Sequence, residues 1–407
     1  MNAKFKKIIY LLNLIILNFI YQNIYINLQA VECKNYTVMG DIHGNLSGLV
    51  DNFTDAGFIN ENCELMAKKT SAGKCIVLMG DIVDRGDASI ESYLMIREMR
   101  QEMRKRDQDI IQLLGNHELL ILQGNMGDSC KNGGIWFISK ERRKELGENF
   151  QNKQACNKPE FSNEEKEKYN FFKKLIQEDI KNGNITAAAV IKVNDKSKKD
   201  IVLTHAGITE KVAKKFAACD ATKANELVLA LNNELKSAIE KKEDKQKKSK
   251  KSKKNKKNMW GKYDDDSNPF GREGIFWTRR NKTLNEDEQQ FVSRVCKEFN
   301  QIRGHVIHKE ITSLEDKSLL TSFISVDTAL YYNRKSFLRI EPSNKEIFNP
   351  SKVKLVETKT LTKCQSVWKK RQKQSTSSYK CGIIELPKDE IIEKTILMVE
   401  EIMTGLI

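Results

Sequence analysis

The sequence lacks the residue spacings that mark common structural zinc sites. It holds nine cysteines in 407 residues but no CxxC pair, and thiolate zinc sites normally use such closely spaced pairs. No internal repeat is present, and histidine is scarce, with five residues in the chain. These absences exclude a zinc-finger-like or repeat architecture and leave few imidazoles for any chemistry. The odd number of cysteines leaves at least one thiol outside any intramolecular disulfide, and sequence alone does not give the pairing.

The chain also lacks an N-terminal apolar run long enough for an ordinary membrane span. Residues 8–20, IIYLLNLIILNFI, form an apolar stretch of 13 residues behind Lys4, Lys6 and Lys7, whereas a spanning helix needs about 20. A basic segment followed by a short apolar one is typical of a secretory signal. We therefore predict a signal peptide over residues 1–30, cleaved after Ala30, and a location in the ER lumen, a derived organelle or the exterior. An uncleaved signal anchor is the alternative.

Two further features suit a luminal path. An oxidising lumen permits disulfides among the cysteines, and five N-x-S/T sequons predict N-glycosylation. No KDEL-like end is present, so the sequence gives no support for retention by that signal. The sequons begin at Asn35, Asn45, Asn52, Asn184 and Asn281.

Positive charge is concentrated rather than spread along the chain. The net charge is +15, and residues 241–257, KKEDKQKKSKKSKKNKK, contribute +9 of it without any aromatic residue. A run of like charges without apolar periodicity is typical of a solvated, disordered segment. We predict a disordered lysine-rich insertion over residues 241–258 and no nucleic-acid partner. A tether to an anionic surface is the alternative role.

The pattern over the first third of the chain predicts an α/β fold. Short apolar runs at residues 36–39, 75–79 and 109–114 each end at a glycine followed by polar residues, and residues 90–104 have helical spacing. Further on, Ser162 and Glu165 form a capping box for a helix to about residue 180. Two strands are expected at 186–193 and 201–208, a helix at 209–240, and closing strands within 319–341. We expect residues 121–160 to have irregular structure and residues 349–407 to form a C-terminal extension of unknown role.

The polar residues at the strand ends form a metal-binding set. Asp41 and His43 are one residue apart, so both side chains can point the same way from an extended turn. Asp81 and Asn116 each follow a glycine that allows a sharp turn at a strand end. Carboxylate, imidazole and amide oxygen suit Mn, Fe or Zn. The set exceeds what one ion needs, and two ions about 3.5–4 Å apart sharing a carboxylate would use all of it.

Three motifs in order then give a resemblance to a family. GDIHG, GDIVDRG and GNHE, followed by THAG and GH, resemble the calcineurin-like metallophosphoesterases, and the DRG extension is similar to the phosphoprotein phosphatase branch. The resemblance covers about residues 36–340 and implies a layered β-sandwich of two sheets flanked by helices. With residues 1–30 as signal and 349–407 as extension, the catalytic domain is expected over 31–348. Its implied cofactor is a pair of divalent ions, with Mn preferred and Fe or Zn as alternatives.

The resemblance also implies a role for each matching residue. His117 would protonate the leaving oxygen, Asp84 would orient His117, and Arg85 would clamp the phosphate, with Glu118 holding the loop or capping the helix. Arg279 in FWTRR matches a second clamp, with Arg280 as its rival, and the role of His308 stays open. The implied metal ligands are Asp41, His43, Asp81, Asn116, His205 and His305.

Departures from the common motifs indicate which branch of the family the sequence resembles, but they do not identify the substrate. The chain has HAG where many relatives have HGG, and RGHVIH where Ser/Thr phosphatases have RAHQ, so it looks closest to the Shewanella-like phosphatases. We expect hydrolysis of phosphomonoesters, on phosphoproteins or phosphopeptides, in the secretory pathway. The alternatives are a hydrolase of small phosphoesters such as dinucleoside polyphosphates and a silent luminal metal-binding module. Serine/threonine against tyrosine preference and oligomeric state are not determined by the sequence.

Overall fold

The computed structural model describes most of the predicted catalytic domain. The described residues are 33–60, 64–67, 73–147, 152–157, 161–192, 200–208, 212, 215–216, 224–248, 268–271, 274–277, 300–305, 312–316, 321–325 and 338–340. The predicted signal peptide, residues 249–258 of the lysine-rich insertion and residues 349–407 lie outside these ranges. Among the helices that are described, none is both long and apolar enough to cross a membrane.

The first sheet has five strands in the order β10-β1-β2-β3-β4. Strands β1, β2, β3 and β4 are parallel, and β10 runs antiparallel to β1 at the edge. The three predicted N-terminal strands are present within a residue or two of the expected limits. The strands are β1 (Asn35–Met39), β2 (Lys74–Leu78), β3 (Asp109–Leu113), β4 (Ile185–Thr186) and β10 (Leu338–Ile340).

The second sheet also has five strands, in the order β5-β6-β7-β9-β8. Strands β6, β7 and β9 are parallel, while β5 and β8 are antiparallel to their neighbours. The predicted pair joined by a polar turn is the antiparallel pair of β5 and β6. The strands are β5 (Ala188–Ile191), β6 (Ile201–Thr204), β7 (Asn300–Arg303), β8 (Thr312–Asp316) and β9 (Thr321–Ser325).

Alternating side chains on β2 show how the two layers are built. Val77 joins an apolar cluster with residues of the second sheet, including Leu203 and Ile302. Its neighbours Ile76 and Leu78 point the other way, into the larger cluster beneath the helices, because successive side chains in a strand face opposite sides. The β-sandwich flanked by helices that the family resemblance implied is therefore the observed architecture.

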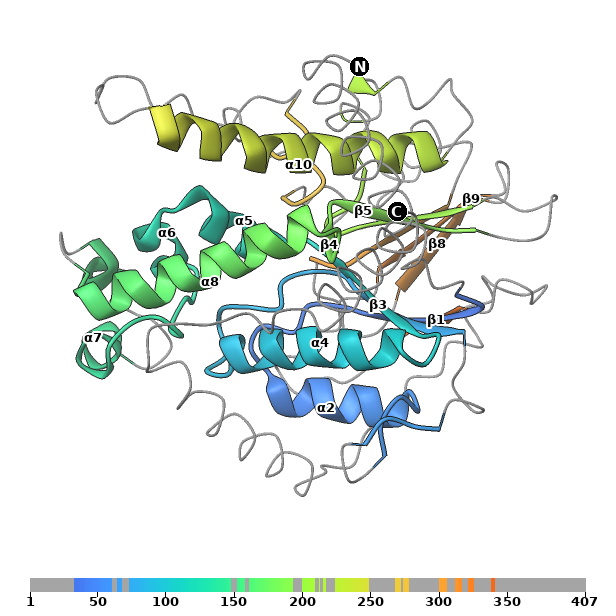
Figure 1. The fold of residues 1–407 in the computed structure, drawn as a ribbon, viewed down its shortest axis with the longest axis horizontal. Coiled ribbons are helices and arrows are strands. Elements are labelled where there is room, and N and C mark those ends of the chain that lie inside the picture. The colour runs from blue at the N-terminus through green and yellow to red at the C-terminus, as the bar shows by residue number, and fades with distance from the viewer. Residues whose placement is uncertain are drawn as a thin grey trace, which may run out of the picture.

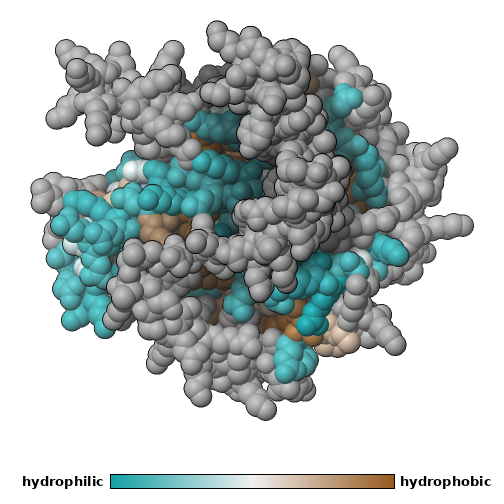
Figure 2. Space-filling view, in the orientation of Figure 1, coloured by the Kyte–Doolittle hydropathy of each residue, from teal (hydrophilic) through white to brown (hydrophobic). Residues whose placement is uncertain are grey.

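Helices cover the outer faces of both sheets (Figure 1). Helix α4 (Ser89–Arg104) packs on β3 and on α2 (Leu46–Asp55), while α10 (Ala224–Lys248) packs on β5, β6 and α8 (Asn163–Lys181). The predicted capping box of α8 is formed, with Ser162 and Glu165 bonding reciprocally. On the face seen in Figure 2 the described surface is mostly hydrophilic, and Leu229 is the large apolar side chain left exposed among the described residues.

Two expectations about local structure were wrong. Residues 121–160, expected to be irregular, contain the end of α5 (Asn116–Gln123), α6 (Met126–Lys131), α7 (Lys140–Leu146) and the 3-10 helix η2 (Lys153–Asn157). Residues 241–248, expected to be disordered, continue α10. Lysine is a good helix former, so the run extends a helix that is already nucleated by the buried part of α10.

Two disulfides connect the described cysteines. Cys33 bonds to Cys75 and so ties the start of β1 to β2, while Cys130 in α6 bonds to Cys156 in η2. One of the sequons is unsuited to modification in the folded domain, because Asn52 is 1% exposed. The other five cysteines lie outside the described residues.

Candidate metal centre

The candidate residues gather because each follows the carboxyl end of a strand. Parallel strands place their carboxyl ends at one edge of a sheet, where α/β proteins bind ligands. Five strands from the two sheets contribute here, and every contributed side chain is buried. In chain order the residues are Asp41 after β1, Asp81 after β2, Asn116 after β3, His205 after β6 and His305 after β7.

Asp81 lies at the centre of the cluster. Its Oδ2 atom lies 3.7 Å from Nε2 of His43, 3.5 Å from Nε2 of His205 and 3.8 Å from Nε2 of His117. Its other oxygen, Oδ1, accepts a hydrogen bond from the backbone N–H of His117 at 2.9 Å. One carboxylate therefore faces imidazoles that come from three different segments.

The residues form two groups that share Asp81. In one group, ligand atoms of His43, Asp81 and His117 lie within 4.8 Å of one another; in the other, those of Asp81, His205 and His305 do. Asp41 borders the first group, with Oδ2 3.8 Å from Nε2 of His43. The first group thus has His117 where the resemblance implied Asp41.

Asn116 borders the second group. Its amide Oδ1 lies 3.0 Å from Nε2 of His205, which is itself 3.2 Å from Nδ1 of His305. The opposite ring nitrogen of His205 contacts the backbone carbonyl of Met79 at 2.7 Å. This contact fixes the ring so that Nε2 faces the cluster.

The backbone of the site loops is held in an unusual conformation. His43, Asp81, Asp84, Arg85 and His305 all have positive φ angles, between 49° and 67°. Non-glycine residues rarely adopt this region, and such strain concentrates at functional sites.

Glu118 joins two of the site loops. Its fully buried carboxylate accepts backbone N–H bonds from Gly115, Asp81, Ile82 and Val83 at 2.8–3.2 Å. The bond from the Gly115 N–H caps the start of α5, where Gly115 is the N-cap residue, as expected for a residue that holds the loop and caps the helix. Burial, together with the charge of Asp81, raises the pKa of Glu118 to about 7.

The carboxylates and imidazoles of the site shift one another's pKa values. Burial lowers the pKa of His205, but Asp81 and Asp41 outweigh burial and raise this pKa to about 10. Conversely, burial raises the pKa of Asp81, but His205 and His117 outweigh it, and the pKa of Asp81 lies well below its usual value. Protons thus concentrate where a divalent cation would displace them.

The residues fit a metal site because they are nitrogen and oxygen ligands and because one buried nitrogen has no hydrogen-bond partner. Nε2 of His43 is buried and makes no hydrogen bond to any described residue, although buried polar atoms nearly always have such a partner. Its other nitrogen contacts the carbonyl of Val83 at 3.0 Å and so fixes the ring. Burial, followed by the neighbouring His117, lowers the pKa of His43 well below its usual value. The imidazole is therefore neutral, and the lone pair on Nε2 is available to bind a metal.

Within the first group, His117 also contacts Asp84 and Arg85. Its Nδ1 lies 2.8 Å from Oδ2 of Asp84, and its Nε2 lies 3.4 Å from Nη2 of Arg85. Burial lowers the pKa of His117, but Asp81 and the hydrogen-bonded Asp84 outweigh it, and the net effect is a raised pKa. A protonated His117 Nε2 next to a cationic side chain can donate a proton to an anionic substrate.

Sequence reasoning missed Trp136. Its indole N–H donates to Oδ1 of Asp84 at 2.7 Å, and the nearby carbonyl of Gly133 accepts from the backbone N–H of Arg85 at 2.7 Å. Both residues belong to the stretch that was expected to be irregular. The tryptophan next to paired glycines in GGIWF was the available signal, but nothing in it indicates the contact with Asp84.

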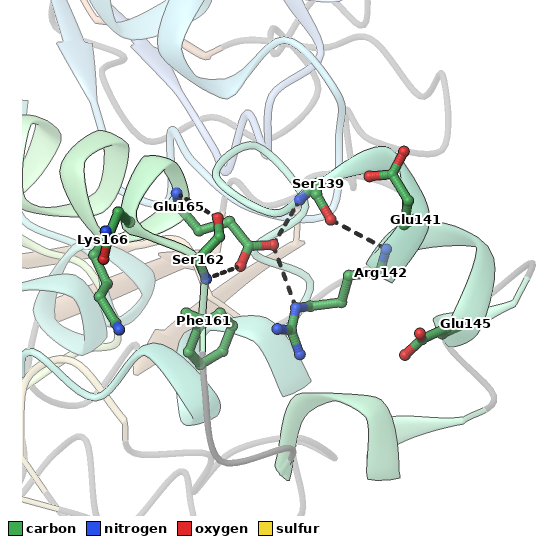
Figure 3. A pocket seen from close by; sticks show the side chains of 9 residues that line it. Ser139, Glu141, Arg142, Glu145, Phe161, Ser162, Glu165 and Lys166 are labelled. Carbon is green, nitrogen blue, oxygen red and sulfur yellow. Dashed lines mark hydrogen bonds and ion pairs between the residues drawn. The ribbon is translucent and has the colours of Figure 1, made fainter.

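Three residues considered from the sequence, Arg279, its rival Arg280 and His308, lie outside the described residues. A separate pocket of about 440 Å³ lies between α7 and the start of α8 (Figure 3), and no predicted site residue lines it. Three of its lining residues, Ser139, Ser162 and Arg142, donate hydrogen bonds to the Glu165 carboxylate.

Comparison with protein families and curated proteins gives a consistent result. The model of the family described as calcineurin-like phosphoesterase matches residues 34–305. Shewanella-like protein phosphatase 2 of Arabidopsis thaliana is 24% identical over 112 residues, which are 28% of this chain and 28% of that protein. Serine/threonine-protein phosphatase 7 of the same plant is 36% identical over 85 residues, which are 21% of this chain and 17% of that protein. The matched segments therefore span less than a third of either relative.

Solved structures of a cold-active protein tyrosine phosphatase are among the chains to which this one is similar. One is 17% identical, covers 76% of this chain and 74% of its own, and gives a TM-score of 0.47. Another, from a psychrophilic Shewanella species, is 16% identical, covers 76% of each chain and gives a TM-score of 0.44.

Proposed function

Because the chain belongs to the calcineurin-like phosphoesterase family, we propose that it is a dinuclear-metal phosphatase that hydrolyses phosphomonoesters on proteins. The observation that carries this proposal is the position of Asp81. Its carboxylate is common to two groups of buried potential ligands, one of which includes His117, and Arg85 lies next to His117. Proton donor, cation and metal ligands thus converge on one small region.

The residues that would hold the ions divide around Asp81. Asp41 and His43 would complete one site, and Asn116, His205 and His305 the other. When bound, two divalent ions would lower the pKa of water and offset negative charge on the phosphoryl group. A set of nitrogen and oxygen donors without thiolate favours Mn, with Fe or Zn as alternatives.

The chain's own residues would carry the remaining steps. The Arg85 guanidinium would bind phosphate oxygens, since its planar fork fits them in a bidentate manner. His117 would give the proton on Nε2 to the leaving oxygen, and Asp84 would hold the ring through Nδ1. Water supplies the new oxygen on phosphorus, and the products are inorganic phosphate and an alcohol.

Phosphoproteins are the proposed substrate class, and two alternative hypotheses are a hydrolase of small phosphoesters and a silent binding module. The curated relatives named above are protein phosphatases by name, which supports a phosphopeptide over a small phosphoester such as a dinucleoside polyphosphate. A silent binding module is disfavoured, since Asp81, His117 and the other described ligands are all present. Neither relative decides between serine/threonine and tyrosine.

The secretory pathway is the proposed location. The basic and then apolar N-terminus supports it, as do two disulfides that need an oxidising compartment. A fusion to a fluorescent protein, combined with protease protection of isolated microsomes, tests the location. If added protease digests the chain while the microsomes are still sealed, the chain lies outside their lumen, which would contradict this location.

The activity test uses metal-stripped protein with Mn²⁺ added back. Substrates are p-nitrophenyl phosphate, phosphoserine, phosphothreonine and phosphotyrosine peptides, and a dinucleoside polyphosphate. Metal-dependent peptide turnover that Asp81→Asn abolishes is the expected result. Turnover of the dinucleotide alone would favour the small-substrate alternative, and no turnover by folded, metal-loaded protein would favour the silent module.

A further inference from the structure

The indole of Trp136 and the ring of His117 contact the two different oxygens of one carboxylate, that of Asp84. Oδ1 of Asp84 accepts from Trp136 Nε1 at 2.7 Å, and Oδ2 lies 2.8 Å from His117 Nδ1. Asp84 is fully buried, and an unpaired oxygen in such a place is costly. The two contacts together fix the rotation of the carboxylate, so the direction of His117 depends on Trp136.

Packing of the indole explains why it can serve as a rigid support. Trp136 stacks on Tyr169 of α8, with ring centroids 5.9 Å apart and planes 7° from parallel, and Phe172 of α8 and Phe137 each lie 4.9 Å away. Trp136 is 6% exposed. Buried aromatic clusters of this kind hold ring directions well, so the N–H points at Asp84 without an ordering cost at the moment of reaction.

The segment that carries Trp136 is fixed on both sides. Before it, the Gly133 carbonyl accepts from the Arg85 N–H, and the disulfide of Cys130 ties α6 to η2. After it, the Ser139 N–H donates to Glu165 Oε1 at 2.7 Å, as Figure 3 shows. The segment therefore reaches from the surface pocket to the site, and its middle residue touches the proton-donor dyad.

We propose that Trp136 is a positioning residue for proton donation, which acts by holding Asp84 so that His117 Nε2 faces the leaving oxygen. This inference rests on the proposed phosphatase function. In the step concerned, the bond between phosphorus and the leaving oxygen breaks while the proton on His117 Nε2 moves to that oxygen. Water forms the new bond to phosphorus. Trp136 touches neither substrate nor metal in this scheme.

Dependence on the leaving group separates this role from a structural one. A weakly acidic alcohol, such as a serine side chain, leaves poorly without a proton, whereas p-nitrophenolate leaves readily without one. Loss of correct proton donation should therefore slow alkyl and phenyl phosphates more than p-nitrophenyl phosphate. A general loss of folded enzyme would slow all of them equally.

The test compares Trp136→Phe with wild type on a phosphoserine peptide, phenyl phosphate and p-nitrophenyl phosphate, using the full chain loaded with Mn²⁺. Phe keeps an aromatic ring and removes the donor. We expect kcat to fall about tenfold for the first two substrates and about twofold or less for the third, with KM little changed. The matched control is Tyr169→Phe, which removes a buried hydroxyl from the same aromatic cluster but no contact to Asp84. It should leave the ratio of rates unchanged.

A second arm checks that the effect passes through Asp84. In an Asp84→Ala background, Trp136→Phe should cause no further change in the rate ratio, because coupled residues are not additive. If Trp136→Phe fails to fold, benzothienylalanine at position 136 replaces the N–H by sulfur and keeps the indole shape. If Trp136→Phe lowers kcat equally on all three substrates, or does not lower it, the inference is wrong. Turnover by the wild-type protein would still support the proposed phosphatase function. Absence of wild-type turnover would overturn both.

Discussion

Oδ2 of Asp81 lies 3.5 Å from Nε2 of His205, although the two residues belong to different sheets of the sandwich. Asp81 follows β2 of the first sheet, and His205 follows β6 of the second. The contact therefore exists only when both sheets are packed and their strand ends are aligned. Metal binding and folding of the sandwich should accordingly be coupled, because the ligands meet only in the folded chain.

Replacing Asp81 by Asn should remove activity and weaken metal binding at both sites. Asn fits the positive φ of 50° at this position but offers one amide oxygen in place of a bridging carboxylate. We expect kcat to fall by about 100-fold or more and the content of Mn²⁺ per chain to decrease, measured by steady-state assay and elemental analysis. Asp87→Asn, which changes an exposed carboxylate on the same loop, is the control and should bind metal normally. Unaltered metal content in Asp81→Asn would contradict the bridging role.

Replacing Glu118 by Gln should destabilise the domain. Four backbone N–H groups point at this carboxylate, and the NH₂ of Gln would face some of them as a second donor. We expect a loss of about 2–3 kcal/mol in the free energy of unfolding, measured by urea denaturation of metal-stripped protein. Glu102→Gln, at a half-exposed pair with Lys105, should change this free energy by about 0.5 kcal/mol or less. Equal effects of the two substitutions would show that Glu118 does not hold the loops together.

Glu165 should make stability depend on acidic pH. Burial raises the pKa of its carboxyl, but the N–H groups of Ser139 and Ser162, with the Arg142 guanidinium, outweigh burial and lower the pKa below the ordinary 4.5. Because the folded pKa is the lower one, the stabilisation is complete above about pH 4.5 and is lost as pH falls through the folded value.

Urea unfolding of wild type and Glu165→Gln between pH 3 and pH 7 tests the role of Glu165. The difference in unfolding free energy should be about 1–2 kcal/mol near pH 6–7 and should shrink toward pH 3. A difference that stays constant across this range would mean that the charge of Glu165 is not what stabilises the turn.

Removing the disulfide between Cys130 and Cys156 should loosen the segment that carries Trp136. The bridge closes a loop with a sequence separation of 26, for which chain entropy predicts a loss of about 3.5 kcal/mol on removal. We expect the Cys130→Ala, Cys156→Ala double variant to show this loss in guanidinium unfolding. Mass spectrometry of unreduced wild-type peptides should show the linkage. An absence of linked peptides in protein from an oxidising host would contradict the pairing.

Much of the fold could be predicted from local sequence. The three N-terminal strands, α4 and the capping box of α8 follow from apolar runs, glycine stops and the Ser162–Glu165 spacing. The short helices of residues 121–160 were missed because glycine and charge weaken their periodicity. The first turns of the lysine run were missed because a run of like charges without apolar periodicity is typical of a disordered segment, although a helix was expected directly before it.

The sequence by itself determined the chemistry of the site: which carboxylates, imidazoles and amide stand directly after strand ends, and in what order. That information is local, since a strand, its glycine and the next polar residue are neighbours in the chain. Only the tertiary structure decided that Asp81 faces both histidine groups, that Glu118 joins two loops and that Trp136 supports Asp84. These contacts join residues far apart in the chain, and they depend on how two sheets and α8 pack, which no local pattern specifies.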